Sequence, residues 1–263
     1  MNEISLYPPP GGLPRRRLCL AVDVEQYSRF DTRTQSAVQA DLVRMLDEAA
    51  AATGLDRTTW ARQPQGDMEF AVLPETTPET SVLGPFVHHL GARLADRNAR
   101  SAAPRVRLRL AVDIGVAADA ALGHAGPAPV AVARYVNAYQ LKEALAALTT
   151  ADLAVIVSDR LYQDVVRSGL VGLDPAQYVR VHVQVKEFGG YGWIRVPGHT
   201  FDEVRRCEPA APEPRSSSEG STPSRTPLSQ HVHHGVAVGG NVSGALTVGP
   251  YGWPARTGPG AAE

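Results

Sequence analysis

Residues 105 to 116 alternate between apolar and other side chains more regularly than the rest of the chain. The apolar members stand at every second position: Val106, Leu108, Leu110, Val112 and Ile114. Because successive side chains of a β-strand point to opposite faces, this spacing puts all five on one face. The chain must therefore build a sheet with at least one buried face around this strand.

Strand patterns and helix patterns alternate along the rest of the domain. We expect further strands at residues 18 to 24, 58 to 63, 68 to 73, 153 to 157, 178 to 185 and 191 to 196. We expect helices at residues 36 to 53, 79 to 98 and 130 to 148, and a short one through Val166 capped by Ser158 or Asp159. Residues 117 to 129, rich in Gly, Ala and Pro, are expected to form a loop.

Two hairpins are predicted from their turn residues, Pro64-Gln65-Gly66-Asp67 and Phe188-Gly189-Gly190. Helices that alternate irregularly with strands and hairpins predict an α+β fold. The sheet should be mixed and mainly antiparallel, with helices on one face.

Both ends of the chain differ from this pattern. Residues 1 to 15 include a Pro-Pro-Pro-Gly-Gly run and are predicted to be a flexible arm, with the folded domain at residues 16 to 198. Residues 199 to 230 are predicted to be a disordered linker, and residues 231 to 263 a Gly/Val-rich tail. Within the tail, uncharged residues 235 to 249 are either plain low-complexity sequence or a β segment that self-associates or recruits a protein partner.

The composition excludes several partners and suggests a compartment. The net charge of -1 gives no basis for nucleic-acid binding. No apolar stretch approaches the roughly 18 residues of a membrane span. Cys19 and Cys207 make no disulfide framework, which favours a cytoplasmic protein.

Two aspartates are the candidate metal ligands. Asp23 ends an apolar strand, and Asp67 lies in the first predicted hairpin turn. If that strand pairs beside the hairpin, the two carboxylates converge, as a phosphate-processing metal site requires. Each residue alone is also typical of an ordinary turn, so only the neighbouring sequence can distinguish a metal ligand from a turn residue.

That neighbouring sequence resembles class III nucleotidyl (adenylate/guanylate) cyclases over residues 16 to 198. The matching segments come in the family's order: Val22-Asp23-Val24-Glu25-Gln26-Tyr27-Ser28, Gln65-Gly66-Asp67 with the strand after it, Arg109 to Gly115, Ala133-Arg134, Val155 to Tyr162, and Lys186. The resemblance implies a ferredoxin-like βαββαβ core with an extra C-terminal helix and hairpin.

The resemblance also implies roles for residues. Asp23 and Asp67 would hold Mg²⁺ or Mn²⁺, and Arg134 would stabilise the transition state of a bound nucleoside triphosphate. The turn Val24-Glu25-Gln26-Tyr27 would cradle phosphates with backbone N–H groups. The family site forms across a dimer, with the acids from one chain and the helix residues from the other, so a homodimer is implied.

Several positions depart from the family pattern. Gln63 stands where the family has its base-reading Lys, and Val130 where it has its ribose-orienting Asn; Arg62 and Asn137 lie nearby. The second base-reading position falls near His124. Three hypotheses remain: a signalling domain that binds metal and nucleotide with weak or no catalysis, an active cyclase with altered base recognition, or a non-enzymatic dimerisation module. Retention of both Asp23 and Asp67 argues against the third.

Overall fold

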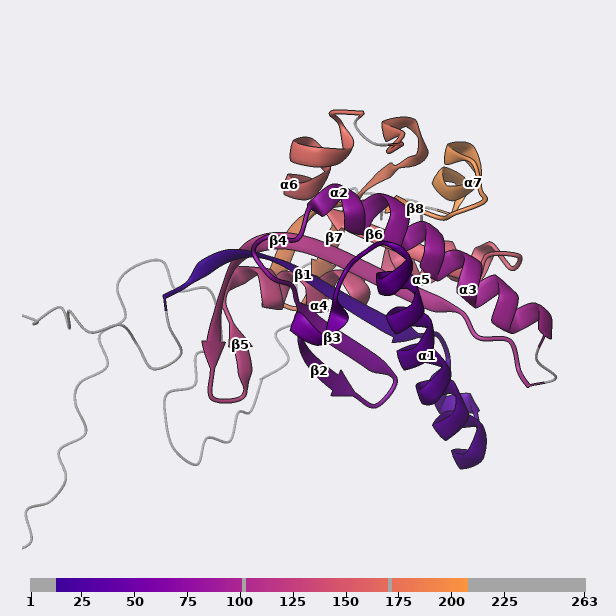
Figure 1. The fold of residues 1–263 in the computed structure, drawn as a ribbon. Helices are drawn as coiled ribbons and strands as arrows, with labels where there is room; N and C mark the ends of the chain where they lie inside the picture. Colours follow the sequence, from indigo (N-terminus) through magenta and orange to yellow (C-terminus); the bar gives the residue numbers. More distant parts are fainter. Residues whose placement is uncertain (1–12, 101–102, 170–171, 208–263) are drawn as a thin grey trace, which may run out of the picture. The chain divides into compact units, whose positions relative to one another are not determined.

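The computed structural model describes residues 13–100, 103–169 and 172–207. Its strands are β1 (Arg15–Val24), β2 (Ala61–Gln65), β3 (Met68–Val72), β4 (Leu108–Ala120), β5 (Gly123–Ala125), β6 (Leu153–Ser158), β7 (Val179–Val185) and β8 (Phe188–Arg195). They form one sheet in the order β2-β3-β1-β4-β6-β8-β7, with β5 paired to β4 (Figure 1). Only β4 and β6 pair in parallel; the other pairs are antiparallel.

The predicted fold class is confirmed. The segment from β1 to β4 contains α1 (Thr32–Ala52) and α3 (Val87–Arg100) in a βαββαβ order, and its strands lie in the ferredoxin-like order β2-β3-β1-β4. The sheet then continues through β6, β8 and β7. The expected C-terminal helix and hairpin are therefore present.

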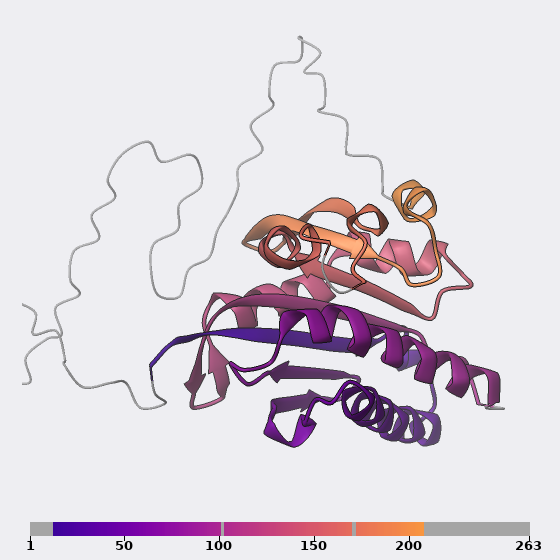
Figure 2. The ribbon, with the colours of Figure 1, turned by 45° about the horizontal axis from the view of Figure 1, so that its top comes forward.

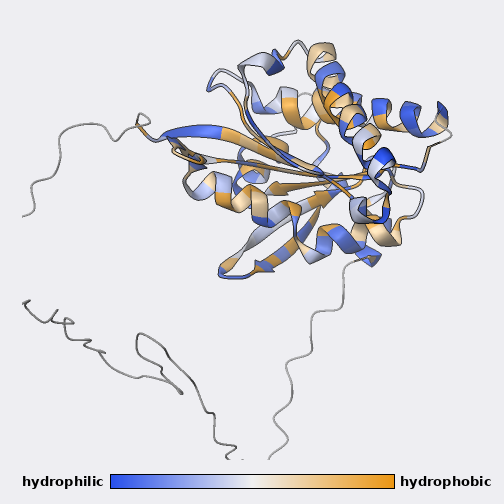
Figure 3. Ribbon diagram, turned by 90° about the horizontal axis from the view of Figure 1, so that it is seen from below, coloured by the Kyte–Doolittle hydropathy of each residue, from blue (hydrophilic) through white to orange (hydrophobic). Residues whose placement is uncertain are grey.

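Helices cover both faces of the sheet, so the prediction of helices on one face is wrong. Alternate residues Leu18, Leu20 and Val22 of β1 pack into one core with α1 and α3. Cys19 and Ala21 pack into a second core with α4 (Pro127–Val136), α5 (Tyr139–Ala147) and α7 (Phe201–Arg206). Figure 1 shows α1 and α3 in front of the sheet and α4 behind it, and Figure 2 gives a second view of these layers. Apolar residues gather along the strands between the helices (Figure 3).

Two helical predictions need adjustment, and the predicted start of a third helix is confirmed. The segment expected as one helix at 79 to 98 contains α2 (Glu79–Ser81), a π-helical turn at Val82–Phe86 that includes Pro85, and then α3. The segment expected at 130 to 148 is two helices, α4 and α5, separated at Asn137 and Ala138. Pro127 at the start of α4 suits a first helical position, where no N–H is needed. The short helix after β6 begins as predicted, with Ser158 accepting a bond from the Leu161 N–H as the cap of α6 (Asp159–Leu161).

Residues 117 to 129 are not the loop that was predicted. Strand β4 continues to Ala120, turns, and pairs with β5, so that Asp119 stands opposite His124. The α4 helix then begins at Pro127.

The closing hairpin turns at Lys186-Glu187, not at Phe188-Gly189-Gly190 as predicted. Lys186 has a φ of 54° in the turn. The glycines lie inside β8, where the rest of the fold approaches the backbone: a Cβ at Gly192 would lie 2.9 Å from Ile156 Cδ1 and 3.1 Å from the Tyr135 ring.

The linker prediction is wrong for residues 201 to 206. These residues form α7, which begins with a capping box between Thr200 and Glu203 and buries Val204. Residues 208 to 230 of the predicted linker and the whole tail, including residues 235 to 249, lie outside the described residues, as do residues 1 to 12 of the predicted arm. Within the described ranges, no helix has the length and hydropathy needed to cross a membrane.

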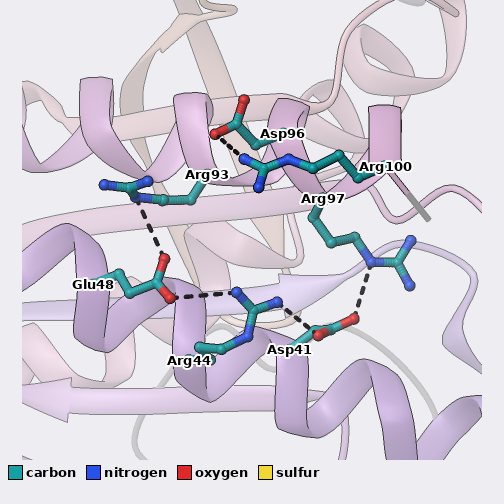
Figure 4. A pocket seen from close by; sticks show the side chains of 7 residues that line it. All are labelled: Asp41, Arg44, Glu48, Arg93, Asp96, Arg97 and Arg100. Atoms are coloured by element: carbon teal, nitrogen blue, oxygen red, sulfur yellow. Dashed lines mark hydrogen bonds and ion pairs between the residues drawn. The ribbon is translucent and has the colours of Figure 1, made fainter.

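A charged hollow of about 420 Å³ lies between α1 and α3 (Figure 4). Its carboxylates and guanidinium groups pair with one another: Asp41 with Arg44 and Arg97, and Glu48 with Arg44 and Arg93. Arg97 is buried, and its Nη1 also donates to the Pro104 carbonyl. We interpret this network as a link between the two helices, because each of its charged groups already has a partner of opposite sign within the chain.

A buried ion pair fixes the first hairpin to α1. Arg57 and Glu69 expose only 4% and 7% of their side chains, and Arg57 Nη2 lies 2.6 Å from both Glu69 carboxylate oxygens. Arg57 also pairs with Asp47 of α1. Removing one partner of a buried pair leaves the other charge without compensation.

We therefore expect Glu69→Ala to lower the free energy of unfolding by about 3 kcal/mol, measured by urea denaturation. Glu75→Ala is the matched control, because Glu75 pairs with Arg15 at an exposed position and such pairs contribute about 1 kcal/mol or less. Equal losses in the two variants would contradict this interpretation.

Asp113 of β4 is buried, with 3% exposure. Burial raises the pKa of its carboxyl group, against the opposing effects of the Ser158 hydroxyl and Arg160. A raised pKa means that the folded chain binds the Asp113 proton more tightly than the unfolded chain. Ionised Asp113 therefore destabilises the fold above the unfolded pKa of about 3.9.

Asp113→Asn should consequently stabilise the protein at about pH 8, by on the order of 1 kcal/mol or a few degrees in Tm. The amide oxygen can still accept the bond from the Ile114 N–H, at 2.8 Å in the parent chain. The gain should shrink as the pH falls through the raised pKa of the folded state, and it should vanish below about pH 3, where the parent carboxyl is protonated in both states. Thermal melts across this range test it; a loss of stability that does not vary with pH would refute it.

Candidate functional site

The two predicted metal ligands lie at one corner of the sheet. Asp23 is next to last in β1, opposite Met68 of β3 and Arg109 of β4. Asp67 lies in the Gly66-Asp67 turn between β2 and β3, where Gly66 has a φ of 69°. The Val24 N–H donates to the Asp67 carbonyl at 3.1 Å, so the end of β1 is bonded directly to this turn. We call Asp23 and Asp67 the acid corner.

Cations from other elements surround the acid corner. Arg109 Nη2 forms an ion pair with Asp23 Oδ2, and both side chains are nearly buried. Burial raises the pKa of Asp23, Arg109 acts in the opposite direction, and the neighbouring Asp67 raises it further. Lys142 of α5 also attracts the Asp23 carboxylate, and burial lowers the pKa of Lys142. The corner thus combines two acids with positive groups that suit phosphate oxygens.

The turn after Asp23 has fewer free N–H groups than the sequence suggested. The N–H of Val24 is bonded to Asp67, and the N–H of Glu25 donates to the Arg107 carbonyl at 2.9 Å. The Glu25 carboxylate pairs with Arg107 at 3.0 Å. Neither residue has a free amide for phosphate.

The remaining two predicted phosphate contacts begin a 3₁₀ turn at Tyr27–Arg29. Gln26 has a left-handed backbone with a φ of 55°. The first N–H groups of such a turn have no partner within it, so those at the start of the turn are the ones able to bind an anion. The Tyr27 hydroxyl accepts a bond from Gln39 at 2.7 Å, which anchors the turn to α1.

Four further positions named by the resemblance surround a single cavity of about 250 Å³ on the α4 face of the sheet. Gln63, His124, Val130 and Arg134 all line it. The remaining lining residues are Ala21, Gln65, Met68, Phe70, Pro129 and Ala133. We call this the α4 cavity. Neither Asp23 nor Asp67 lines it, although Met68, opposite Asp23, does.

The polar side chains of the α4 cavity are held by neighbours. Arg134 Nη2 pairs with Glu187 of the β7–β8 turn at 3.0 Å. His124 Nε2 lies 3.2 Å from Asp119 Oδ1. Gln63 Nε2 donates to the Leu122 carbonyl at 3.3 Å, and a Cβ at Gly123 would lie only 1.3 Å from that nitrogen. Among the described residues, His124 Nδ1 and Arg134 Nε are buried without a hydrogen-bond partner.

The fold places this site among known proteins. No protein-family model matches the sequence, and no curated protein is significantly similar to it. The crystal structure of the guanylyl cyclase Cya2 is similar with a TM-score of 0.51 and 11% identity, over 71% of this chain and 93% of that one. The chain has the fold of a nucleotidyl cyclase catalytic domain.

A bacterial light-regulated adenylyl cyclase is similar to the same degree. Its TM-score is 0.51 at 11% identity, over 80% of this chain. This chain spans 61% of the length of that protein. The fold is therefore shared with a guanylyl cyclase and with an adenylyl cyclase.

Sequence reasoning missed two residues at the acid corner, Arg109 and Lys142. Arg109 was noted only as the first residue of a motif, although it is the one basic residue of β4 and its register opposite Asp23 was open to prediction. Lys142 carried no such signal, because its place depends on the separation of α4 from α5.

Proposed function

We propose that this chain is a nucleotidyl cyclase-like signalling domain that binds a nucleoside triphosphate with Mg²⁺ or Mn²⁺ and has weak or no cyclase activity. The observation that carries the proposal is the acid corner, where the bond from Val24 to the Asp67 carbonyl (3.1 Å) joins two acid-bearing elements. Mg²⁺ is commonly bound by one or two carboxylates together with substrate phosphates.

The residues of the corner fit such an ion. Within the described ranges, no group of three or more His, Cys, Asp or Glu side chains gathers as a metal cluster. Asp23 and Asp67 would therefore hold the cation jointly with phosphate oxygens, and the bound cation would neutralise phosphate charge. Arg109, now paired with Asp23, can exchange that carboxylate for a phosphate oxygen, since a guanidinium binds either anion well.

The α4 cavity supports nucleotide binding with poor turnover. Val130, 49% exposed, offers no hydrogen bond to a ribose hydroxyl. Arg134 pairs with the exposed Glu187, so it must exchange this carboxylate for a phosphate oxygen before it contacts a triphosphate. Because cyclisation needs the 3′-hydroxyl aligned on the α-phosphate, loss of an orienting contact slows it severely.

A homodimer is part of the proposal. The acid corner and the α4 cavity have separate linings within one chain, so a complete site needs the corner of one chain to meet the cavity of another. We further propose a cytoplasmic location and a partner-binding role for residues 231 to 263.

The first test incubates the full chain with each of the four ribonucleoside triphosphates and Mn²⁺. We expect a metal-dependent rise in Tm with at least one nucleotide, and little or no cyclic product. Substantial product would favour an active cyclase with altered base recognition, with Gln63 and His124 as its base contacts. The absence of both a Tm shift and a cyclic product would favour a non-enzymatic dimerisation module.

Asp23→Asn and Asp67→Asn should each abolish the metal-dependent part of that shift, because an amide is a far weaker ligand for a hard cation. The Asp23→Asn substitution keeps an amide oxygen that can accept a hydrogen bond from Arg109. Asp164→Asn, which alters an exposed pair with Arg16, is the matched control and should leave the shift unchanged. If the Asp23→Asn variant keeps the full metal-dependent rise in Tm, the acid corner is not the metal site.

The dimer makes a complementation prediction. Asp23→Asn and Arg134→Ala chains should each bind metal–nucleotide poorly when pure. Mixed after co-refolding, they should regain about a quarter of the parent sites, because random pairing gives half heterodimers with one intact site each. Calorimetric stoichiometry measures this; no recovery on mixing, with both variants folded, would mean that the site does not span two chains.

A further inference from the structure

A second ion pair lies beside the acid corner on the same two strands. Glu25 directly follows β1, and Arg107 directly precedes β4. The Glu25 N–H donates to the Arg107 carbonyl at 2.9 Å, and Arg107 Nη1 lies 3.0 Å from the Glu25 carboxylate. Arg107 exposes 16% of its side chain and Glu25 12%. Because residues two apart on a strand share a face, this pair and the pair of Asp23 with Arg109 are neighbours across β1 and β4.

The other N–H groups of Arg107 hold the end of α5. Its Nη2 donates to the Leu148 carbonyl at 2.9 Å and also to the Leu145 carbonyl. Its Nε donates to the Ala151 carbonyl at 2.8 Å. The last carbonyl groups of a helix have no partner within the helix, so a guanidinium is well suited to bind them. One side chain therefore joins the turn after Asp23 to the C-terminal end of α5.

Helix α5 brings a positive charge to the acid corner. Lys142 lies in this helix of 9 residues, and it attracts the Asp23 carboxylate. Its Nζ donates to Asn137 Oδ1 at 3.2 Å, at the break between α4 and α5. Because α5 is short, the attachment of its C-terminal end sets where Lys142 stands relative to Asp23.

The two arginines differ in how many of their hydrogen bonds are already made. Arg109 pairs with Asp23 through Nη2, and its Nε is buried without a hydrogen-bond partner in the part of the chain that the structure describes. Arg107 has a partner at each of Nε, Nη1 and Nη2. Arg109 can therefore turn toward a phosphate oxygen, whereas Arg107 would lose its bonds to α5 if it did so.

We propose that Arg107 is a positioning residue for the acid corner. It fixes α5 to Glu25 and so holds Lys142 beside Asp23, where the Lys142 ammonium group binds a triphosphate oxygen. This inference rests on the proposed nucleotide-binding function and adds to it a phosphate contact, Lys142, and the residue through which that contact is placed.

The test is calorimetric titration of the full chain with Mn²⁺ and each of the four ribonucleoside triphosphates. Arg107→Lys keeps a positive charge beside Glu25, but one ammonium group cannot reproduce the guanidinium fork that reaches both Glu25 and α5. We expect about tenfold weaker binding of the nucleotide that the parent chain binds best, as for the loss of one hydrogen bond to a charged group. Lys142→Ala should weaken binding by the same factor, and Lys142→Arg should keep most of the affinity.

The matched control is Arg105→Lys. Arg105 donates to the Thr149 and Thr150 carbonyl groups and pairs with Asp152, all in the segment between α5 and β6. Within the described ranges its hydrogen bonds reach neither Glu25 nor a residue of α5. This substitution should therefore leave the nucleotide affinity unchanged.

A double variant separates positioning from a general effect on stability. If Arg107 acts through Lys142, adding Arg107→Lys to Lys142→Ala should weaken binding no further, because no side chain is left to position. If Arg107 only stabilises the fold, the two losses should multiply.

Multiplied losses in the double variant, or parent affinity in Arg107→Lys, would overturn the proposal. If Arg107→Lys fails to fold, Lys142→Ala decides alone, and an unchanged affinity there counts against the proposal. Failure of the proposed function has a different signature, because the parent chain itself would then bind no nucleotide with Mn²⁺, and this inference would fall with it.

Discussion

The register of β1 is the constraint on which the rest of the structure depends. This strand lies between β3 and β4 and is buried on both faces. Its even-numbered residues from Leu18 to Val24 belong to the core under α1 and α3, and Cys19 and Ala21 to the core under α4. A slip by one residue would exchange these faces and move Asp23 away from Arg109. Core packing and the acid corner are thus set by the same pairing.

Much of the fold could be predicted because its signals are local. The alternation in β4 and the turn residues around Gly66 belong to short stretches of sequence, and both elements are present. That helices cover both faces of the sheet could also have been predicted, because five successive apolar residues in β1 indicate burial on both sides. The turn at Lys186 was missed because glycine is the usual turn residue, whereas Gly190 lies inside β8, where the Tyr135 hydroxyl approaches its backbone.

The site was predictable to a smaller extent. Asp23 and Asp67 could be named because each follows a recognisable element, and the register confirms that these elements are neighbours. The sequence could not predict which N–H groups of the turn are free. The N–H groups of Val24 and Glu25 donate to the carbonyl groups of Asp67 and Arg107, which are distant in the sequence. The α4 cavity could not be predicted without the β4–β5 hairpin, and a Gly/Ala-rich stretch gives no strand pattern from which to predict that hairpin.

The contact between Gln63 and Gly123 has a consequence for how this chain can change through evolution. Gly123 has a φ of 115°, and the absence of its side chain is what lets the Gln63 amide lie against the hairpin tip. A larger residue at position 123 would displace Gln63 without replacing any residue that lines the cavity. Changes at these two positions should therefore show epistasis, each altering the effect of the other. The lining of the α4 cavity can therefore change through a substitution at a residue that is not part of that lining.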